Sequence, residues 1–165
     1  MRTFATMEIQ FYKSQGTGND FILIDNRQLY FPKNDTKLVA KLCDRKFGIG
    51  ADGLILLEHH DTVDFTMVYY NADGNISSMC GNGGRCITHF ANFLGLIDTE
   101  ATFEAIDGIH ETKISEGLVH LKMNDVTEIT EETTHSFLNT GSPHHVEMVA
   151  DLDTFDVFSN GRRER

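Results

Sequence analysis

The sequence is poor in the features that mark several classes of protein. Its 165 residues include no tryptophan, 2 prolines and 3 cysteines. An odd cysteine count does not make a disulfide framework, which favours reduced thiols in a cytoplasmic setting. Apolar runs such as Leu54–Leu57 are too short to span a membrane. The first six residues lack the apolar stretch of a secretory signal, and Met7 is an alternative start.

Basic residues are also scarce. There are 14 Lys and Arg against 25 Asp and Glu, a formal net charge of −11. Nucleic acid and anionic membrane surfaces attract basic patches, so this balance argues against both as partners. The remaining composition, 40% hydrophobic and 24% charged, is that of a soluble globular protein. We expect a single domain over residues 1–165, with its core in 7–150.

Much of the chain has the alternating or short apolar patterns of β-strands. The expected strands are 7–14, 21–25, 54–58, 65–71, 102–106, 109–115, 117–123, 135–139 and 144–150. A glycine-rich loop at 15–20 separates the first two strands. Turn signals at Asp107-Gly108 and Glu116-Gly117 predict a meander of hairpins. Residues 151–165 lack clear periodicity and resemble a chain cut between elements.

Two segments have helical periodicity. The first follows Asp35, a plausible N-cap, and ends at Gly48. The second extends from about Gly83 to Leu94, and its apolar residues surround much of the helix. A helix of that kind belongs in the centre of a domain. The predicted fold class is therefore α/β in the α+β sense, a strand-rich mixed sheet or barrel wrapped around one central helix.

The strongest chemical signal lies at Cys80, which Gly-Asn-Gly-Gly follows directly before the second helix. Small residues let the backbone approach a ligand and leave its N–H groups open. The positive end of the helix dipole favours an anion, either a ligand carboxylate or the thiolate. Cys80 is therefore a candidate nucleophile or acid–base group. The structural alternative is a buried cysteine beside a tight turn, which is common in proteins.

Four sequence blocks resemble the diaminopimelate epimerase family. They are, in order, Gly16–Phe21, Gly48–Gly53, Asn71–Cys86 and Thr140–His144. The resemblance implies interconversion of LL- and meso-diaminopimelate, in lysine and peptidoglycan biosynthesis, without pyridoxal phosphate, metal or another cofactor. It also implies a fold of two similar domains, each giving one cysteine, with the α-carbon of the substrate between them.

The resemblance also assigns roles to residues of this chain. Cys80 would be a catalytic thiol, and His144 would lie near the catalytic cysteines. The expected substrate contacts are Asn19, Asn71, Gly81, Asn82, Gly83 and Ser142. Of these, Ser142 departs from the asparagine that many family members have, and its side chain has a shorter reach.

The family's second cysteine is missing. Neither Cys43 nor Cys86 is followed by glycine, so neither matches the Cys-Gly-Thr-Gly block of the family's second half, and both are predicted packing residues. One thiol alone would return the proton to the face from which it came. We therefore expect half of a two-base site, inactive alone, with the family's second domain absent. The oligomeric state is open, and a homodimer is compatible with the sequence.

Other interpretations were weighed against this one. A zinc site at Cys80, Cys86 and His89 lacks a second ligand pair at standard spacing. A phosphate loop at 16–18 lacks the lysine of a P-loop and leads into a strand. Proline racemase-like enzymes share the two-thiol logic but more often have histidine where this chain has Asn82. Phenazine-biosynthesis-like isomerases share the fold but lack the cysteine motif. A non-catalytic half-domain that binds an amino acid or a protein stays open.

Overall fold

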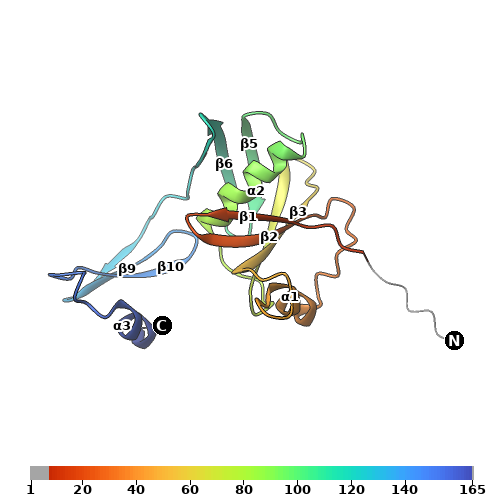
Figure 1. Cartoon of the computed structure of the whole chain (residues 1–165). Coiled ribbons are helices and arrows are strands. Elements are labelled where there is room, and N and C mark those ends of the chain that lie inside the picture. Colours follow the sequence, from red (N-terminus) through yellow and green to blue (C-terminus); the bar gives the residue numbers. More distant parts are fainter. Residues whose placement is uncertain (1–7, 165) are drawn as a thin grey trace. The chain divides into compact units, whose positions relative to one another are not determined.

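The computed structural model describes residues 8–164, which form two compact units (Figure 1). The first unit ends at Met123 and the second begins at Asn124. The expected start of the first strand at residue 7, the alternative start at Met7 and the leading segment lie outside the described residues. The expectation of one domain over 1–165 stays a prediction.

The first unit is built on a seven-stranded mixed sheet whose strands follow one another in chain order. These strands are β1 (Tyr12–Gly16), β2 (Asn19–Asp25), β3 (Gly53–Glu58), β4 (Phe65–Asn71), β5 (Glu100–Ala105), β6 (Gly108–Ser115) and β7 (Leu118–Leu121). Neighbouring strands are antiparallel except for two pairs, β2 with β3 and β4 with β5. A helix lies in the connection between the strands of each parallel pair. Parallel strands need a long crossover connection, which is usually helical.

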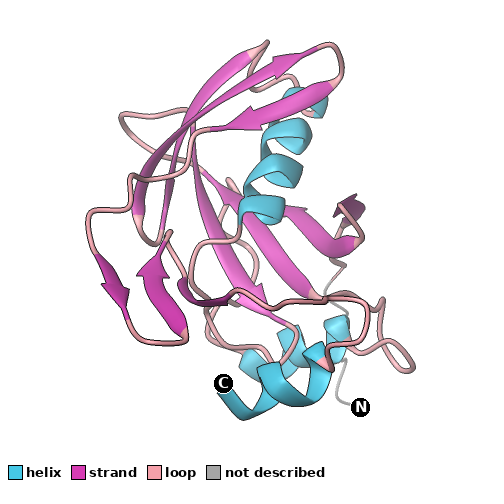
Figure 2. Ribbon diagram, turned by 90° about the vertical axis from the view of Figure 1, so that its left-hand side faces the viewer, coloured by secondary structure: helices cyan, strands magenta, loops and turns pink. Residues whose placement is uncertain are grey.

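The helix α2 (Gly81–Phe93) lies within the curl of this sheet (Figure 2). Its buried face packs on a core that includes Phe21, Leu23 and Phe103. The shorter helix α1 (Thr36–Cys43) belongs to a second core cluster with Ile22 and Ile24. Alternate residues of β2 therefore enter two different cores. This explains why β2 and β3 are continuous apolar runs, since both of their faces are buried. The predicted central helix is confirmed.

The first unit departs from the sequence-based expectation at three places. The first strand, expected over 7–14, begins only at Tyr12, and the described residues before it are not in a strand. The loop expected at 15–20 is a tight hairpin, because β1 extends to Gly16 and β2 begins at Asn19. The first helix ends at Cys43 instead of reaching Gly48. The Asp44 carboxylate accepts the N–H groups of Lys46 and Phe47, both at 2.7 Å, and this local turn replaces the helix.

The second unit has a three-stranded antiparallel sheet in the order β10, β9, β8, and one helix. These elements are β8 (Ile129–Glu131), β9 (His135–Asn139), β10 (Pro143–Glu147) and α3 (Val157–Glu164). The sequence did not predict β8 or α3. None of the described residues of α3 is buried, so the helix has no apolar stripe to reveal it. Its first turn is held by Asp156, whose carboxylate accepts the Ser159 N–H at 3.0 Å.

Candidate active site

Cys80 is the N-cap residue of the central helix α2. Its Sγ accepts the N–H of Gly83 at 3.4 Å, and its carbonyl accepts the N–H of Gly84 at 2.8 Å. The sequence-based prediction of a cysteine directly before the central helix is confirmed. The first-turn N–H groups of a helix lack intrahelical acceptors, so the sulfur faces the positive end of α2. This setting suits a bound anion such as a carboxylate.

The glycines after Cys80 let the first turn of α2 approach the sheet closely. A Cβ at Gly83 would lie 3.0 Å from Ile55 Cδ1 and 3.0 Å from Met67 Cε. A Cβ at Gly84 would lie 2.9 Å from Leu121 Cδ2 and 2.9 Å from Met79 Cε. Real Cβ atoms rarely come this close to a neighbour. The Gly-Gly pair therefore lets the turn lie close against the sheet, and a Cβ at either position would displace the end of a flexible side chain.

The β1–β2 hairpin forms a second wall beside Cys80. Asn19 Oδ1 accepts a hydrogen bond from the Cys80 thiol at 3.7 Å and from Asn82 Nδ2 at 3.3 Å. At the hairpin tip, Thr17 has a positive φ of 55°, and its hydroxyl lies 3.1 Å from Asn82 Oδ1. Three of the residues singled out from the sequence, Asn19, Cys80 and Asn82, therefore lie together.

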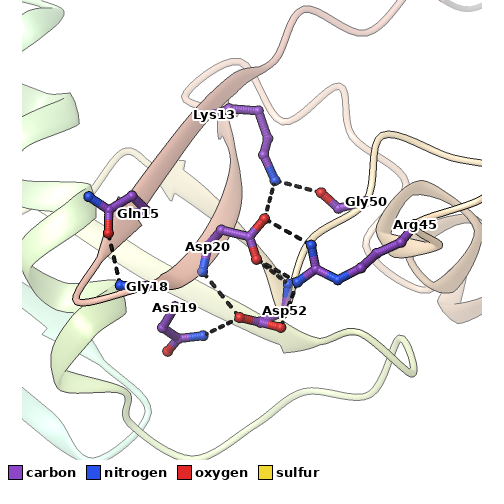
Figure 3. Close-up of polar contacts among 8 residues, drawn as sticks. All are labelled: Lys13, Gln15, Gly18, Asn19, Asp20, Arg45, Gly50 and Asp52. Carbon is purple, nitrogen blue, oxygen red and sulfur yellow. Dashed lines mark hydrogen bonds and ion pairs between the residues drawn. The ribbon is translucent and has the colours of Figure 1, made fainter.

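A network of ion pairs supports this hairpin (Figure 3). Asp20 is bound by Arg45 at 2.7 Å and by Lys13 at 2.8 Å. Asp52 is bound by Arg45 at 2.8 Å and accepts the Asn19 amide at 2.9 Å. The hydrogen bond from Arg45, followed by that from Lys13, holds the pKa of Asp20 well below its usual range. The bond from Asn19 is the main cause that lowers the pKa of Asp52. Both groups are carboxylates at neutral pH.

Asn71, another expected substrate contact, lies at the end of β4 and is held by a tyrosine. The Tyr69 hydroxyl donates to Asn71 Oδ1 at 3.1 Å. Burial raises the pKa of Tyr69 to about 12, and the charge of Cys80 adds to that rise. Tyr69 is therefore a neutral hydrogen-bond donor to Asn71 at neutral pH. Tyr69 was not predicted from the sequence, where its only signal was its place in an alternating strand.

The other two cysteines are packing residues, as predicted. Cys43 and Cys86 are 3% and 4% exposed. Burial raises the pKa of Cys43 to about 11 and raises that of Cys86 as well. Cys80, in contrast, is half-buried and adjoins the polar groups of the hairpin. Of the three thiols, Cys80 is the one placed for chemistry.

The remaining candidates, Ser142 and His144, belong to the second unit, at the β9–β10 turn. His144 Nδ1 lies 2.8 Å from the Ser142 carbonyl, and the Thr140 hydroxyl lies 3.4 Å from the same nitrogen. These contacts fix the His144 ring within its own turn. The expected roles of Ser142 and His144 beside Cys80 stay predictions.

Residues 8–164 lack two features that would point to other functions. No described helix is long and apolar enough to cross a membrane. No group of three or more His, Cys, Asp or Glu side chains in this part of the chain is arranged to hold a metal ion.

Comparison with known sequences places this site in a family context. A profile of the family described as diaminopimelate epimerase matches residues 11–129. A protein named diaminopimelate epimerase from Flavobacterium psychrophilum is 56% identical over 158 residues, which are 95% of this chain and 62% of that protein. One of the same name from Chlorobaculum tepidum is 44% identical over 154 residues, 88% of this chain and 60% of that protein. The chain thus spans about three fifths of the length of these relatives.

Comparison with solved structures concerns the fold alone, because sequence identity is low. A hydroxyproline epimerase from Agrobacterium vitis matches with a TM-score of 0.66 at 14% identity, over 94% of this chain and 56% of that one. A Bacillus anthracis protein of the PhzF phenazine-biosynthesis family matches with a TM-score of 0.64 at 15% identity, over 88% of this chain and 56% of that one. These likenesses confirm the predicted fold class. Taken with the sequence matches, they show that the chain belongs to the diaminopimelate epimerase family.

Proposed function

We propose that this chain supplies one half of the active site of an enzyme that interconverts LL- and meso-diaminopimelate. The observation that carries the proposal is the position of Cys80, which caps α2 through the Gly83 N–H and donates to Asn19. The names of the sequence relatives support the substrate. Lysine and peptidoglycan biosynthesis in the cytoplasm is the setting that this activity implies.

The proposed reaction moves one proton at each of two thiols. The Cys80 thiolate, or its counterpart, takes the proton from the α-carbon and becomes a neutral thiol. The electron pair of the broken C–H bond remains on the substrate as a carbanion. A second thiol on the opposite face then gives its proton to that carbon and becomes a thiolate. The configuration is inverted, and no pyridoxal phosphate or metal takes part.

The carbanion needs fixed hydrogen-bond donors at the substrate carboxylate, because an α-proton is only weakly acidic. The backbone N–H groups of Gly81 and Asn82 belong to the first turn of α2, next to Cys80. First-turn N–H groups are open to an anion and are aligned with the helix dipole. We assign the carboxylate to this turn. Asn19 and Asn71 would bind the same substrate.

The second thiol must come from residues outside this chain. Cys43 and Cys86 are buried in the core and have raised pKa values, so neither is suited to deliver a proton. We propose that the chain is inactive alone and that its partner thiol lies in the remaining length of the family's proteins, in a Cys-Gly-Thr-Gly block. Any pairing of whole molecules as a homodimer would be separate from that requirement.

The test is α-hydrogen exchange of diaminopimelate in D₂O, followed by NMR and mass spectrometry. The full-length protein that contains this chain should take up deuterium at the α-carbon with inversion. Cys80→Ala should slow the exchange by about 10²–10⁴-fold or more, because it removes a positioned acid–base group. The matched control is Cys43→Ala, which removes a buried thiol of the same type and should leave exchange near the parent rate.

Three results would contradict the proposal or a part of it. If Cys80→Ala exchanges as fast as Cys43→Ala, then Cys80 is not the base. If the parent protein binds diaminopimelate without exchange, it is an amino-acid binder, the alternative that the sequence left open. Robust epimerisation by the 165-residue chain alone would contradict the half-site in particular.

A further inference from the structure

The two asparagine side chains beside Cys80 are aligned head to tail. Arg85 Nη2 donates to Asn82 Oδ1. Asn82 Nδ2 then donates to Asn19 Oδ1 at 3.3 Å, and Asn19 Nδ2 donates to Asp52 Oδ2 at 2.9 Å. Every hydrogen bond in this series has the same direction, from the guanidinium of Arg85 to the carboxylate of Asp52. The Cys80 thiol joins the series at Asn19 Oδ1.

The two ends of the series fix that direction. A carboxylate only accepts hydrogen bonds, and a guanidinium only donates them, whereas an asparagine amide can do either. If Asn19 turned over, its carbonyl would face the carboxylate of Asp52. If Asn82 turned over, its amino group would face the guanidinium of Arg85. Both arrangements bring like groups together, so each amide has one favoured orientation.

Asp52 is itself held in place as an anion. Its Oδ1 accepts from Arg45 at 2.8 Å, and its Oδ2 accepts the backbone N–H of Asp20 at 3.2 Å as well as the Asn19 amide (Figure 3). These hydrogen bonds, that from Asn19 first, lower its pKa. Asp52 accepts from the amino group of Asn19, whereas the Cys80 thiol donates to its carbonyl oxygen, and Asp52 has no contact with the thiol among the hydrogen bonds of the described residues.

We propose that Asp52 and Arg85 are positioning residues that act through Asn19 and Asn82. They keep an acceptor, the Asn19 carbonyl, next to a donor, the Asn82 amino group, at the Cys80 thiol. An α-amino acid carries an ammonium donor and a carboxylate acceptor on one carbon, so this pair complements it. The inference rests on the proposed function for its substrate class, but the coupling itself exists without substrate.

The experiment measures the rate of Cys80 alkylation by iodoacetamide in the 165-residue chain at neutral pH, by mass spectrometry of the Cys80 peptide. In Asp52→Asn the Asn19 amide can turn its N–H groups toward the sulfur, so the Cys80 thiol loses the acceptor that holds its S–H. We expect alkylation to become about threefold faster or more, the range of coupling found between contacting residues. In an Asn19→Ala background the same Asp52→Asn change should lose this effect.

Asp20→Asn is the matched control for charge. It removes one carboxylate from the same ion-pair network without touching the Asn19 side chain. In the parent chain, Asp52→Asn should change the rate of Cys80 alkylation more than Asp20→Asn does. In the Asn19→Ala background, the two substitutions should change that rate equally. Equal effects of Asp52→Asn and Asp20→Asn in the parent chain would overturn the inference. So would an Asp52→Asn effect that still exceeds that of Asp20→Asn in the Asn19→Ala background.

The opposite end of the series gives an independent test if Asp52→Asn does not fold. Arg85→Gln can present either end of its amide to Asn82, whereas Arg85→Lys can only donate. Arg85→Gln should therefore change the rate of Cys80 alkylation only when Asn82 is present, and the change should vanish in an Asn82→Ala background. Arg85→Lys should change the rate less than Arg85→Gln does. Additive effects would overturn the inference. Because no turnover is measured, loss of diaminopimelate exchange would refute the proposed function and leave this coupling intact.

Discussion

The two helices of the first unit begin in different ways. The N-cap of α1 is Asp35, whose carboxylate accepts the Leu38 N–H at 3.0 Å. The N-cap of α2 is Cys80, whose sulfur accepts the Gly83 N–H at 3.4 Å. Aspartate is among the preferred N-cap residues, whereas sulfur is a weak acceptor. The helix with the poorer cap is the one at the centre of the unit.

The residues that follow each cap differ in the same sense. The first turn of α1 contains Lys37 and Leu38, both good helix formers. The first turn of α2 contains three glycines, at positions 81, 83 and 84, which are poor ones. The start of α1 therefore favours helix stability, while the start of α2 keeps a thiol and open N–H groups at the positive end of a buried helix. Local sequence preferences for a helix are therefore weakest at the helix start that holds the candidate site.

Substitution of Gly74, which contacts the start of α1, should lower the free energy of unfolding most. Gly74 has a φ of +89°, and a Cβ there would lie 2.0 Å from the carbonyl oxygen of Thr36, the first residue of α1. Gly74→Ala should lower the free energy of unfolding by about 3 kcal/mol or more, because strain and a backbone clash add. Urea denaturation measures the change.

Gly95 is the control for that substitution. It has a φ of +69° but open space around it, so Gly95→Ala carries the strain alone. The expected loss is about 1–2 kcal/mol. Equal losses for the two variants would show that the start of α1 can move away from the turn at Gly74.

Substitutions at the two N-caps should change the free energy of unfolding less. Serine is a preferred N-cap residue, so Cys80→Ser should leave the free energy of unfolding unchanged or raise it by less than about 1 kcal/mol. Asp35→Ala at the α1 cap should lower it by about 1 kcal/mol. Thermal and urea unfolding of both variants decide the comparison. A loss in Cys80→Ser as large as that in Asp35→Ala would mean that the thiol is kept for stability.

The sequence predicted those parts of the fold that depend on local pattern. The apolar runs of β2 and β3, the turn at Asp107-Gly108 and the cap at Asp35 are each visible within a few residues. The place of Cys80 before the central helix is local in the same way. The helix α3 was missed because it buries no described side chain, and α1 was predicted too long because Asp44 forms a competing turn.

The support around the candidate site could not be predicted, because it joins distant parts of the chain. Asp52 meets Asn19 across 33 positions, and Arg45 meets Asp20 across 25. No spacing rule relates such pairs, and charged residues in loops are usually solvated. Register between β2 and β3 brings Asp20 and Asp52 to one end of the sheet, and that register appears only in the folded chain.

The most direct test of the central claim, that the start of α2 singles out Cys80, is competitive alkylation of the three cysteines in the folded 165-residue chain at pH 8. Cys43 is buried and has a pKa of about 11, so only about a thousandth of it is thiolate at that pH. Cys86 is buried and its pKa is raised in the same direction. We predict that Cys80 is modified first and that the other two react only after unfolding. Modification of Cys43 or Cys86 as fast as Cys80 in the folded chain would contradict the account.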